Sequence, residues 1–510
     1  MNQIHMSTIK NIYHLLLSAL FVVVLASCSD EFLEEEPLGT PSSATLFADE
    51  EGAMRAINGA YSHLRSWDVL GFPYFAVKEL PSDDADVGST PGDGSFPRLE
   101  LINTFQYDPT VGELNGYWVG SYRGINRANQ VIFNVPDIDM DENLKSRLIA
   151  EARFLRALYY FDLVRVFGEV PIIDKVYTDP EDARVAVDKS PVDAVYEFII
   201  SDLNEAVQVL PMKSEYNPSD LGRATKGAAQ SLLAKVHLFQ QDYQSAYDHA
   251  QAVIQSGEYD LYPDYRALFF PEQENGIESI FEAQIIERED RAISNEYTKW
   301  QGVRGSFGWG FNSPSEDLSN TYEEGDPRRT ATIFYSGDTL EGADEPYILP
   351  LDQGAQPRAN KKMMLPFDLH PAGYPDNSPT NYIFLRYADV LLIFAEAANE
   401  LGKTSEALTH LNMVRARARG GNPDVLPDIT ETSQSELREI IWHERRVELA
   451  MEGHRFFDII RQNEVVPGRA TEIFHSNGKT SFDINKHATF PIPQAQIDIS
   501  QGILKQDQNW

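Results

Sequence analysis

The chain has 510 residues, of which 42% are hydrophobic and 24% are charged, so it is long enough and apolar enough to bury a large core. Its formal net charge of -35 argues against a nucleic-acid partner and against direct adsorption to an anionic lipid surface, since both require a basic face. The single cysteine excludes an intrachain disulfide.

The first 27 residues are predicted to be a lipoprotein signal peptide. An apolar run from Leu15 to Ala26 follows Lys10 and is too short to form a transmembrane helix. It ends in Leu-Ala-Ser-Cys at residues 25–28, which resembles the bacterial lipobox, in which the cysteine receives diacylglycerol. We therefore expect Cys28 to be the lipid attachment site; an ordinary signal peptide is the alternative.

Residues 28–43 are predicted to be an acidic, flexible tether. The run Glu34-Glu35-Glu36 is followed by Pro37, a composition typical of solvated, unfolded chain. A helical pattern of apolar residues begins at about residue 44 and continues to about residue 65.

Residues 66–112 are expected to be rich in loops. Four carboxylates, Asp83, Asp84, Asp86 and Asp93, lie in a stretch with many glycines and prolines. They could hold a calcium ion, but their spacing lacks the fixed glycine and the terminal glutamate of an EF-hand. We favour a solvated loop, and predict no metal site and no cofactor.

Two segments share the 34-residue pattern of a tetratricopeptide-like helical hairpin, 227–260 and 388–421. Each has two alanines twelve residues apart, where close contact between helices tolerates only a small side chain: Ala234 with Ala246, and Ala395 with Ala407. In the second hairpin Gly402 suits a left-handed turn, and Thr404 or Ser405 could cap the helix that follows. Two unrelated hairpins are the alternative. Other helices are expected at 114–134, 144–167 and 191–210.

Residues 261–382 lose this periodicity and are rich in Pro, Gly and aromatic residues. Aromatic loops on a rigid scaffold are typical of recognition surfaces, and sugars stack on aromatic rings. Packing in the core is the competing role for each ring, and it is the role we assign to Trp118 and Trp442, which lie in predicted helices. The candidate ligand-binding residues in the two loop-rich segments are Trp67, Tyr74, Trp300, Phe307 and Trp309.

The last long helix is expected at 435–462, interrupted by Gly453. It contains His443-Glu444-Arg445-Arg446-Val447, which lacks the second histidine of a zinc-protease HExxH motif. We expect these charges to form pairs four residues apart along the helix and to pack within the scaffold.

Several of these segments together resemble the SusD-like (SusD/RagB) family of outer-membrane nutrient-binding lipoproteins. They are Ala152–Tyr160 with Gly168 and Pro171, Leu385–Leu391, Leu411–Ala418, Glu444–Asp458, Pro491–Pro493 and Gln508–Trp510. The resemblance implies a mainly α fold, in which tetratricopeptide-like helix pairs carry large irregular loop insertions and a few short strands. It also implies one globular domain over 44–510, with a scaffold at about 44–65, 113–260 and 383–465, and a ligand face at about 66–112 and 261–382.

The same resemblance implies a non-enzymatic protein, lipid-anchored in the outer membrane and facing the outside of the cell. Its expected partners are a glycan ligand and a SusC-like TonB-dependent β-barrel transporter, to which it delivers the glycan. Three other functions stay open: a peptide-binding member of the family, a surface glycosidase with paired carboxylates, and a scaffold for protein–protein contacts.

Overall fold

The computed structural model describes residues 46–510, except 286, 289–290, 293–294, 307, 347, 349–355 and 370–377. The predicted signal peptide, Cys28, the tether at 28–43 and Phe307 lie outside the described residues. Within the described part of the chain, no helix is long and apolar enough to cross a membrane.

Helices dominate the molecule. The longer ones are α3 (Glu50–His63), α7 (Gly112–Asn134), α8 (Glu142–Phe167), α10 (Val192–Val209), α11 (Lys226–Phe239), α12 (Tyr243–Ser256), α16 (Tyr387–Glu400), α17 (Thr404–Ala418), α18 (Gln434–Glu448) and α19 (Arg455–Val465). The shorter ones are α4 (Trp67–Leu70), α5 (Phe72–Lys78), α6 (Phe96–Asn103), α9 (Pro180–Val185), α13 (Glu296–Gln301), α14 (Glu316–Thr321), α15 (Pro327–Thr332), α20 (Arg469–Ser476), α21 (Ile484–His487) and α22 (Gln494–Ile499).

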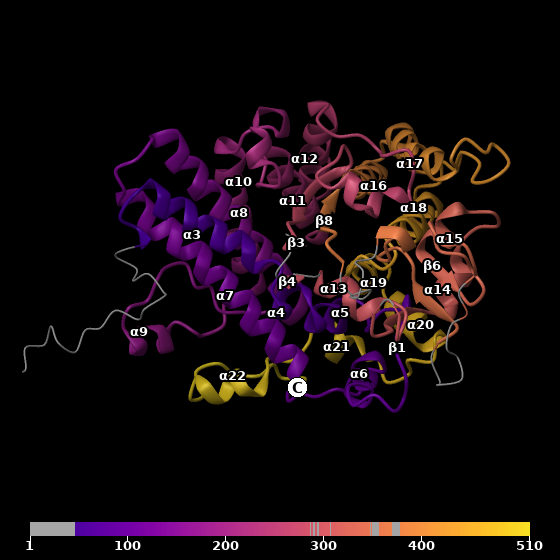
Figure 1. Cartoon of the computed structure of the whole chain (residues 1–510). Helices are drawn as coiled ribbons and strands as arrows, with labels where there is room; N and C mark the ends of the chain where they lie inside the picture. The colour runs from indigo at the N-terminus through magenta and orange to yellow at the C-terminus, as the bar shows by residue number, and fades with distance from the viewer. Residues whose placement is uncertain are drawn as a thin grey trace, which may run out of the picture.

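The long helices form one continuous array. Contacts run from α3 to α7, α8, α10, α11, α12, α16 and α17 in that order, and α18 packs on α16 (Figure 1). The two predicted hairpins are α11–α12 and α16–α17, and the alanines that define their pattern are fully buried. Gly402 has the expected left-handed conformation, with φ +73°. The capping prediction is wrong: Lys403 precedes α17 and makes no side-chain cap, so neither Thr404 nor Ser405 has that role.

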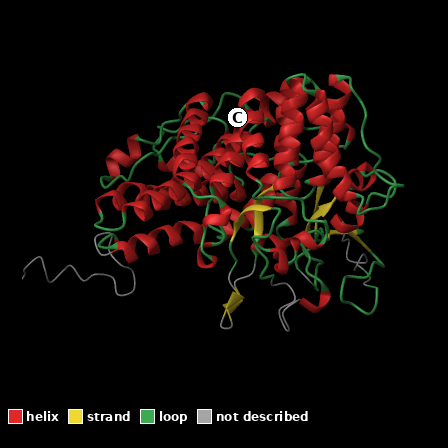
Figure 2. Cartoon of the chain, turned by 90° about the horizontal axis from the view of Figure 1, so that it is seen from above, coloured by secondary structure: helices red, strands yellow, loops and turns green. Residues whose placement is uncertain are grey.

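Short antiparallel strand pairs accompany the helices, and two of them, β1–β5 and β2–β8, join segments that are distant in sequence. The strands are β1 (Ala85–Gly88), β2 (Ser279–Ala283), β3 (Glu287–Arg288), β4 (Arg291–Ala292), β5 (Phe311–Pro314), β6 (Ile333–Tyr335), β7 (Arg358–Asn360) and β8 (Tyr382–Arg386). They pair as β1–β5, β2–β8, β3–β4 and β6–β7. Figure 2 shows them along one side of the helices. One hydrophobic core includes residues of both the array and the irregular region, such as Leu391 and Phe281.

The segment 66–112 differs from the expected solvated loop. It contains α4, α5 and α6, and Asp83 and Asp84 are 2% and 0% exposed. Each carboxylate pairs with an arginine: Arg455 Nε lies 2.7 Å from Asp83 Oδ1, and Arg446 Nε lies 2.7 Å from Asp84 Oδ1. Because these carboxylates already bind arginines, they do not form the calcium site considered above. Among the described residues, no cluster of three or more His, Cys, Asp and Glu side chains could hold a metal ion.

The predicted helix at 435–462 is divided in two. α18 ends at Glu448 and α19 begins at Arg455, with Met451 and Gly453 at φ +63° and +78° between them. The predicted pairing of charges along this helix is also wrong. Glu444 and Glu448 bind arginines from other elements, including Arg328 of α15, because they face the interior of the molecule.

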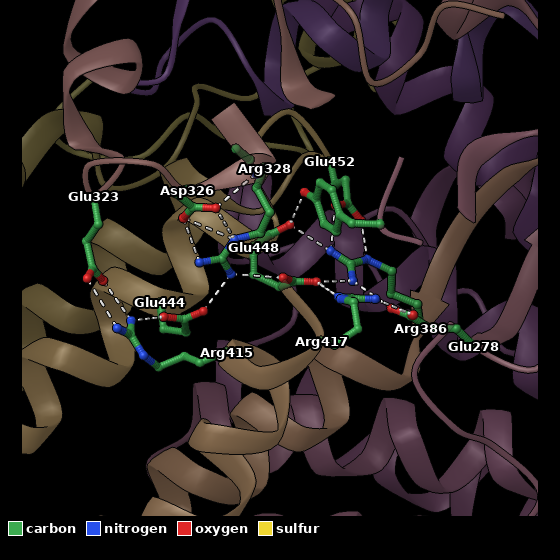
Figure 3. Close-up of polar contacts among 12 residues, drawn as sticks. Glu278, Glu323, Asp326, Arg328, Arg386, Arg415, Arg417, Glu444, Glu448 and Glu452 are labelled. Atoms are coloured by element: carbon green, nitrogen blue, oxygen red, sulfur yellow. Dashed lines mark hydrogen bonds and ion pairs between the residues drawn. The ribbon is translucent and has the colours of Figure 1, made fainter. Parts of the chain in front are cut away.

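These contacts belong to a buried ionic network that fastens the irregular region to the helices (Figure 3). Arg328 Nη1 lies 2.5 Å from Glu444 Oε1 and 3.0 Å from Glu448 Oε2. Arg386 of β8 bridges Glu448 and Glu452, at 2.7 and 2.8 Å. The adjacent arginines hold the pKa of the Glu448 carboxyl well below its usual range, although its burial opposes this. The conspicuous charges of this motif are therefore structural.

Candidate functional site

Two tryptophans come together where α13 is followed by a tight turn. The rings of Trp300, on α13, and Trp309 have centroids 5.6 Å apart and planes inclined by 35°. The Trp309 amide donates to the Lys299 carbonyl at 3.1 Å, which closes the turn. Gly308 is required there, because a Cβ atom would lie 2.5 Å from the same carbonyl oxygen. Backbone geometry thus places Trp309 beside Trp300.

A third tryptophan, Trp67, is linked to this pair by the ring of Phe72, which contacts both Trp67 and Trp300. Trp67 begins α4 and is stacked with Phe72 at 6.4 Å, with ring planes only 6° apart. Phe72 in turn meets the Trp300 ring edge-on at 5.0 Å, and Phe311 at 5.4 Å. We call these five residues, Trp67, Phe72, Trp300, Trp309 and Phe311, the aromatic patch.

The aromatic patch has an exposed layer and a buried layer. Trp67 and Trp309 are 47% and 42% exposed, and Trp300 is half-buried. Phe72 and Phe311 are 3% and 1% exposed and pack underneath. Supported indole rings at the surface lose little conformational freedom on binding, which suits the stacking of a flat apolar ligand face.

Two arginines border the aromatic patch. The Arg98 guanidinium lies 5.4 Å from the centre of the Phe72 ring, and its Nε is 2.5 Å from Glu113 Oε1. Arg304 Nη1 donates to the Trp309 carbonyl at 3.3 Å and pairs with Asp93 Oδ2 at 3.0 Å. Because each arginine is paired with a carboxylate, these two ion pairs place hydrogen-bonding groups beside the aromatic patch and add no net charge to it.

A buried carboxyl group fixes α13 against α5. The Tyr297 hydroxyl, on α13, donates to Glu79 Oε1 at 2.5 Å, and the Gly453 amide donates to the same oxygen at 2.6 Å. Burial raises the pKa of Glu79 to about 7, and these two hydrogen bonds oppose the rise. The helix that carries Trp300 is therefore held from beneath by a group that titrates near neutral pH.

The structure brings together three of the five sequence candidates, Trp67, Trp300 and Trp309. The prediction that Tyr74 binds ligand is wrong, because its side chain is 2% exposed and its hydroxyl lies 3.0 Å from the Tyr382 hydroxyl in the core. Phe307 lies outside the described residues. Trp118 and Trp442 are 4% and 1% exposed, as their assignment to packing requires.

Sequence reasoning missed the supporting residues Phe72 and Phe311 and the bordering Arg98 and Arg304. Phe72 follows Trp67 by five residues in the same aromatic-rich segment, which was a usable signal. Arg98 and Arg304 had no such signal, since their position depends on contacts between distant segments.

Comparison with known proteins identifies the family. Residues 256–510 match the model described as the SusD family, and residues 92–238 match one described as starch-binding, associating with the outer membrane. SusD-like protein P2 of Formosa agariphila is 33% identical over 500 residues, which cover 93% of this chain and 95% of that protein. A SusD-like protein of Bacteroides ovatus is 30% identical over 510 residues, covering 91% and 84%.

Solved structures agree in fold. A laminarin-binding SusD-like protein superposes with a TM-score of 0.75 and 29% identity, covering 91% of this chain and all of that one. A SusD-like protein from Bacteroides fragilis gives a TM-score of 0.76 at 25% identity, covering 92% and 99%. The chain belongs to the SusD family of glycan-binding proteins, and its helical array with irregular insertions is the SusD-like fold.

Proposed function

We propose that this chain is a non-enzymatic, cell-surface lipoprotein that captures a glycan on the aromatic patch and delivers it to a SusC-like TonB-dependent transporter. The observation that carries the proposal is the surface formed by Trp67, Trp300 and Trp309. Trp67 precedes Trp300 and Trp309 by more than 230 positions in sequence, yet packed rings join all three through Phe72.

The chemistry of the aromatic patch favours an uncharged glycan. Sugar rings have apolar C–H faces that stack on indoles, and each such contact contributes roughly 1–3 kcal/mol. A charged ligand would have to displace the carboxylate partners of Arg98 and Arg304, and the side chains of these partners are only 5% and 13% exposed. The carboxylates in these pairs, Glu113 and Asp93, are held by arginines, which gives no support to a paired-carboxylate glycosidase.

Laminarin is the first ligand to test, because a protein of the same fold at 29% identity is described as laminarin-binding. Starch is the second, because the family model that matches residues 92–238 is described as starch-binding. The sample is the soluble chain 29–510, which lacks only the predicted signal peptide and Cys28. Calorimetric titration and retardation in a glycan-containing gel report binding, and analysis of the incubated glycan for shorter products reports hydrolysis.

Three variants then locate the site. Trp67→Ala, Trp300→Ala and Trp309→Ala should each weaken binding by roughly 1–3 kcal/mol, the scale of an aromatic anchor. The matched control is Phe133→Ala, which removes an aromatic ring that is 58% exposed on α7 and should leave affinity unchanged. If all three tryptophan variants retain full affinity for a glycan that the protein binds, the site lies elsewhere. Binding of peptides in place of either glycan would favour the peptide-binding alternative.

The anchor and the transporter complete the proposal. Cys28 follows the lipobox-like sequence and is the single thiol of the chain, which supports its lipidation. The description of the matching family as associated with the outer membrane supports the location. Co-purification of a TonB-dependent transporter with the tagged full-length protein from native outer membranes tests the partnership, and its absence from an otherwise intact preparation would count against delivery.

A further inference from the structure

A groove of about 630 Å³ lies between α7, the segment around α9, and α22, and it borders α4, since Arg123 in its lining pairs with Asp68 next to Trp67. These helices are labelled in Figure 1. Its walls are mainly apolar and aromatic, and Ile499 at its side is 71% exposed. The residues that dominate the walls are Trp118, Tyr122, Ile173, Tyr177, Ile499 and Leu504. A groove of this kind is a binding surface for apolar side chains, since exposing them to water carries a cost.

The groove also has a distinct charge. Its charged lining residues are Arg123 and Arg184, although the chain as a whole has a net charge of -35. Arg123 pairs with Asp68 at 3.1 Å and Arg184 pairs with Glu181, and both arginine side chains are accessible, at 64% and 31%. Such surface pairs contribute about 0–1 kcal/mol, so a carboxylate of a docked segment can compete for these arginines. The groove is therefore complementary to an acidic segment that carries apolar side chains.

The chain has a segment of this composition outside the described residues. Residues 30–38 read Asp-Glu-Phe-Leu-Glu-Glu-Glu-Pro-Leu, with Phe32 and Leu33 between acidic runs. The aliphatic side chains in the walls, Ile173, Ile499 and Leu504, suit the apolar side chains of Phe32 and Leu33.

The segment is long enough to reach the groove. α3 lies along α7: Arg127 Nη1 donates to the Gly59 carbonyl at 3.1 Å, and the His63 ring nitrogen Nε2 lies 2.8 Å from the Gly120 carbonyl. Arg123 of the groove thus lies on the part of α7 that faces the second half of α3. A helix of 14 residues is about 21 Å long. The 13 Cα–Cα steps from Leu33 to Leu46 can extend over about 45 Å, roughly twice that length.

We propose that residues 30–38 dock in this groove, with Phe32 or Leu33 against its apolar walls and the carboxylates of Glu34–Glu36 beside Arg123 and Arg184. This goes beyond the proposed capture and delivery of a glycan. Because Cys28 lies two residues before the segment, docking would turn the α7–α22 side of the protein toward the membrane. The protein would then be held in a defined orientation in place of swinging on a free tether.

Disulfide trapping in the chain 29–510 tests this directly, because that chain contains no cysteine. Phe32→Cys or Leu33→Cys is combined with Ile499→Cys in the groove, and both tether positions are used since neighbouring residues of an extended segment point in opposite directions. The matched control combines the same tether cysteines with Phe133→Cys, at an exposed site on α7. Phe133 lies near the start of α3, whose Glu50 is 3.5 Å from the Asp141 amide beyond the end of α7. An undocked tether would therefore meet position 133 at least as readily as position 499.

The readout is the rate of intrachain disulfide formation in a glutathione buffer at low protein concentration, normalised to the reactivity of each single thiol. We expect at least one tether cysteine to close on position 499 ten times faster than on position 133. Arg123→Gln with Arg184→Gln should lower the first rate several-fold and leave the second unchanged. Equal rates at the two positions would overturn the proposal. So would disulfides that form mainly between chains in a concentration-dependent way, since the groove would then receive a second copy.

Discussion

The rings of Trp300 and Trp309 pack 5.6 Å apart and share the exposed face of the aromatic patch, whereas no ring contact among the described residues joins Trp309 to Trp67. This difference predicts how their contributions to binding combine. Removing Trp300 also removes the support of Trp309. The loss of glycan affinity in the double variant should therefore differ from the sum of the losses in Trp300→Ala and Trp309→Ala by about 0.5–3 kcal/mol. Trp67→Ala and Trp309→Ala should be additive within about 0.5 kcal/mol. Calorimetry on the single and double variants measures both cycles, and equal coupling in the two would contradict this geometry.

The pKa of Glu79 predicts a pH dependence of stability. Burial raises this pKa from 4.5 to about 7, so the folded protein keeps the proton over a range in which the unfolded chain loses it. The stabilisation is fully present below about pH 4.5 and is lost as the pH rises through about 7, and its size is about 3 kcal/mol at most, since one pKa unit corresponds to about 1.4 kcal/mol.

Glu79→Gln removes this titration while it keeps the size of the side chain. The difference in free energy of unfolding between Glu79→Gln and the unmodified protein should shift in favour of the variant between about pH 5 and pH 8, by up to about 3 kcal/mol. Urea denaturation at the two pH values measures it. Glu51→Gln, at an exposed position on α3, is the control and should show no comparable shift. A constant difference across this range for Glu79→Gln would mean that Glu79 is ionised throughout.

The ionic network predicts a large effect of Arg328→Met. The Arg328 side chain is fully buried and binds Asp326, Glu444 and Glu448, so its loss leaves buried carboxylates with one partner fewer. We expect a loss of about 3–5 kcal/mol in the free energy of unfolding. Arg55→Met breaks the exposed pair with Glu51 on α3 and should change stability by less than about 1 kcal/mol. Urea denaturation compares the two, and similar effects would show that the buried network adds little.

Replacing Gly124 of α7 by alanine should cause a steric clash, although alanine has the higher helix propensity. A Cβ atom at this position would lie 2.2 Å from the Tyr159 ring, which is 3% exposed and confined by its neighbours. Gly124→Ala should therefore destabilise the protein, because overpacking costs about 1–3 kcal/mol and outweighs the gain of about 1 kcal/mol in helix propensity. Gly112→Ala, where nothing lies within 4 Å, is the control and should be neutral or stabilising. A Gly124→Ala variant with an unchanged or higher melting temperature would show that α7 and α8 can shift apart enough to accommodate the added methyl group.

The proposed lipid anchor predicts the behaviour of Cys28→Ala in cells. Without its thiol the precursor has no site for diacylglycerol, so it should stay uncleaved by the lipoprotein signal peptidase and unlabelled by radioactive palmitate. Labelling followed by electrophoresis measures both properties. Ser27→Ala keeps the thiol and a small residue before it, and should be processed normally. Continued labelling of Cys28→Ala would refute the assignment.

The sequence was sufficient for the helical array because local forces decide helices. Apolar residues recur with the period of a helix, and alanines recur at the twelve-residue spacing of two close hairpins, which the structure has as α11–α12 and α16–α17. Gly402 marked the turn between α16 and α17 because a left-handed residue is nearly free of strain only as glycine. Similar reasoning selected Trp67, Trp300 and Trp309 as recognition residues, since all three lie in aromatic segments without helical periodicity.

Only the tertiary structure decided which of these side chains face solvent and which charges meet. Tyr74 and Trp67 lie in the same segment with similar composition, yet one is 2% and the other 47% exposed. Both α4 and α5 pack against α7 and α13, but only Tyr74 is directed into the core, against Tyr297 and Tyr382. Glu444 and Arg328 are 116 residues apart, and no local pattern pairs them. Helices and turns follow from interactions within a few residues, whereas exposure and ion pairing depend on which distant segments the folded chain brings together.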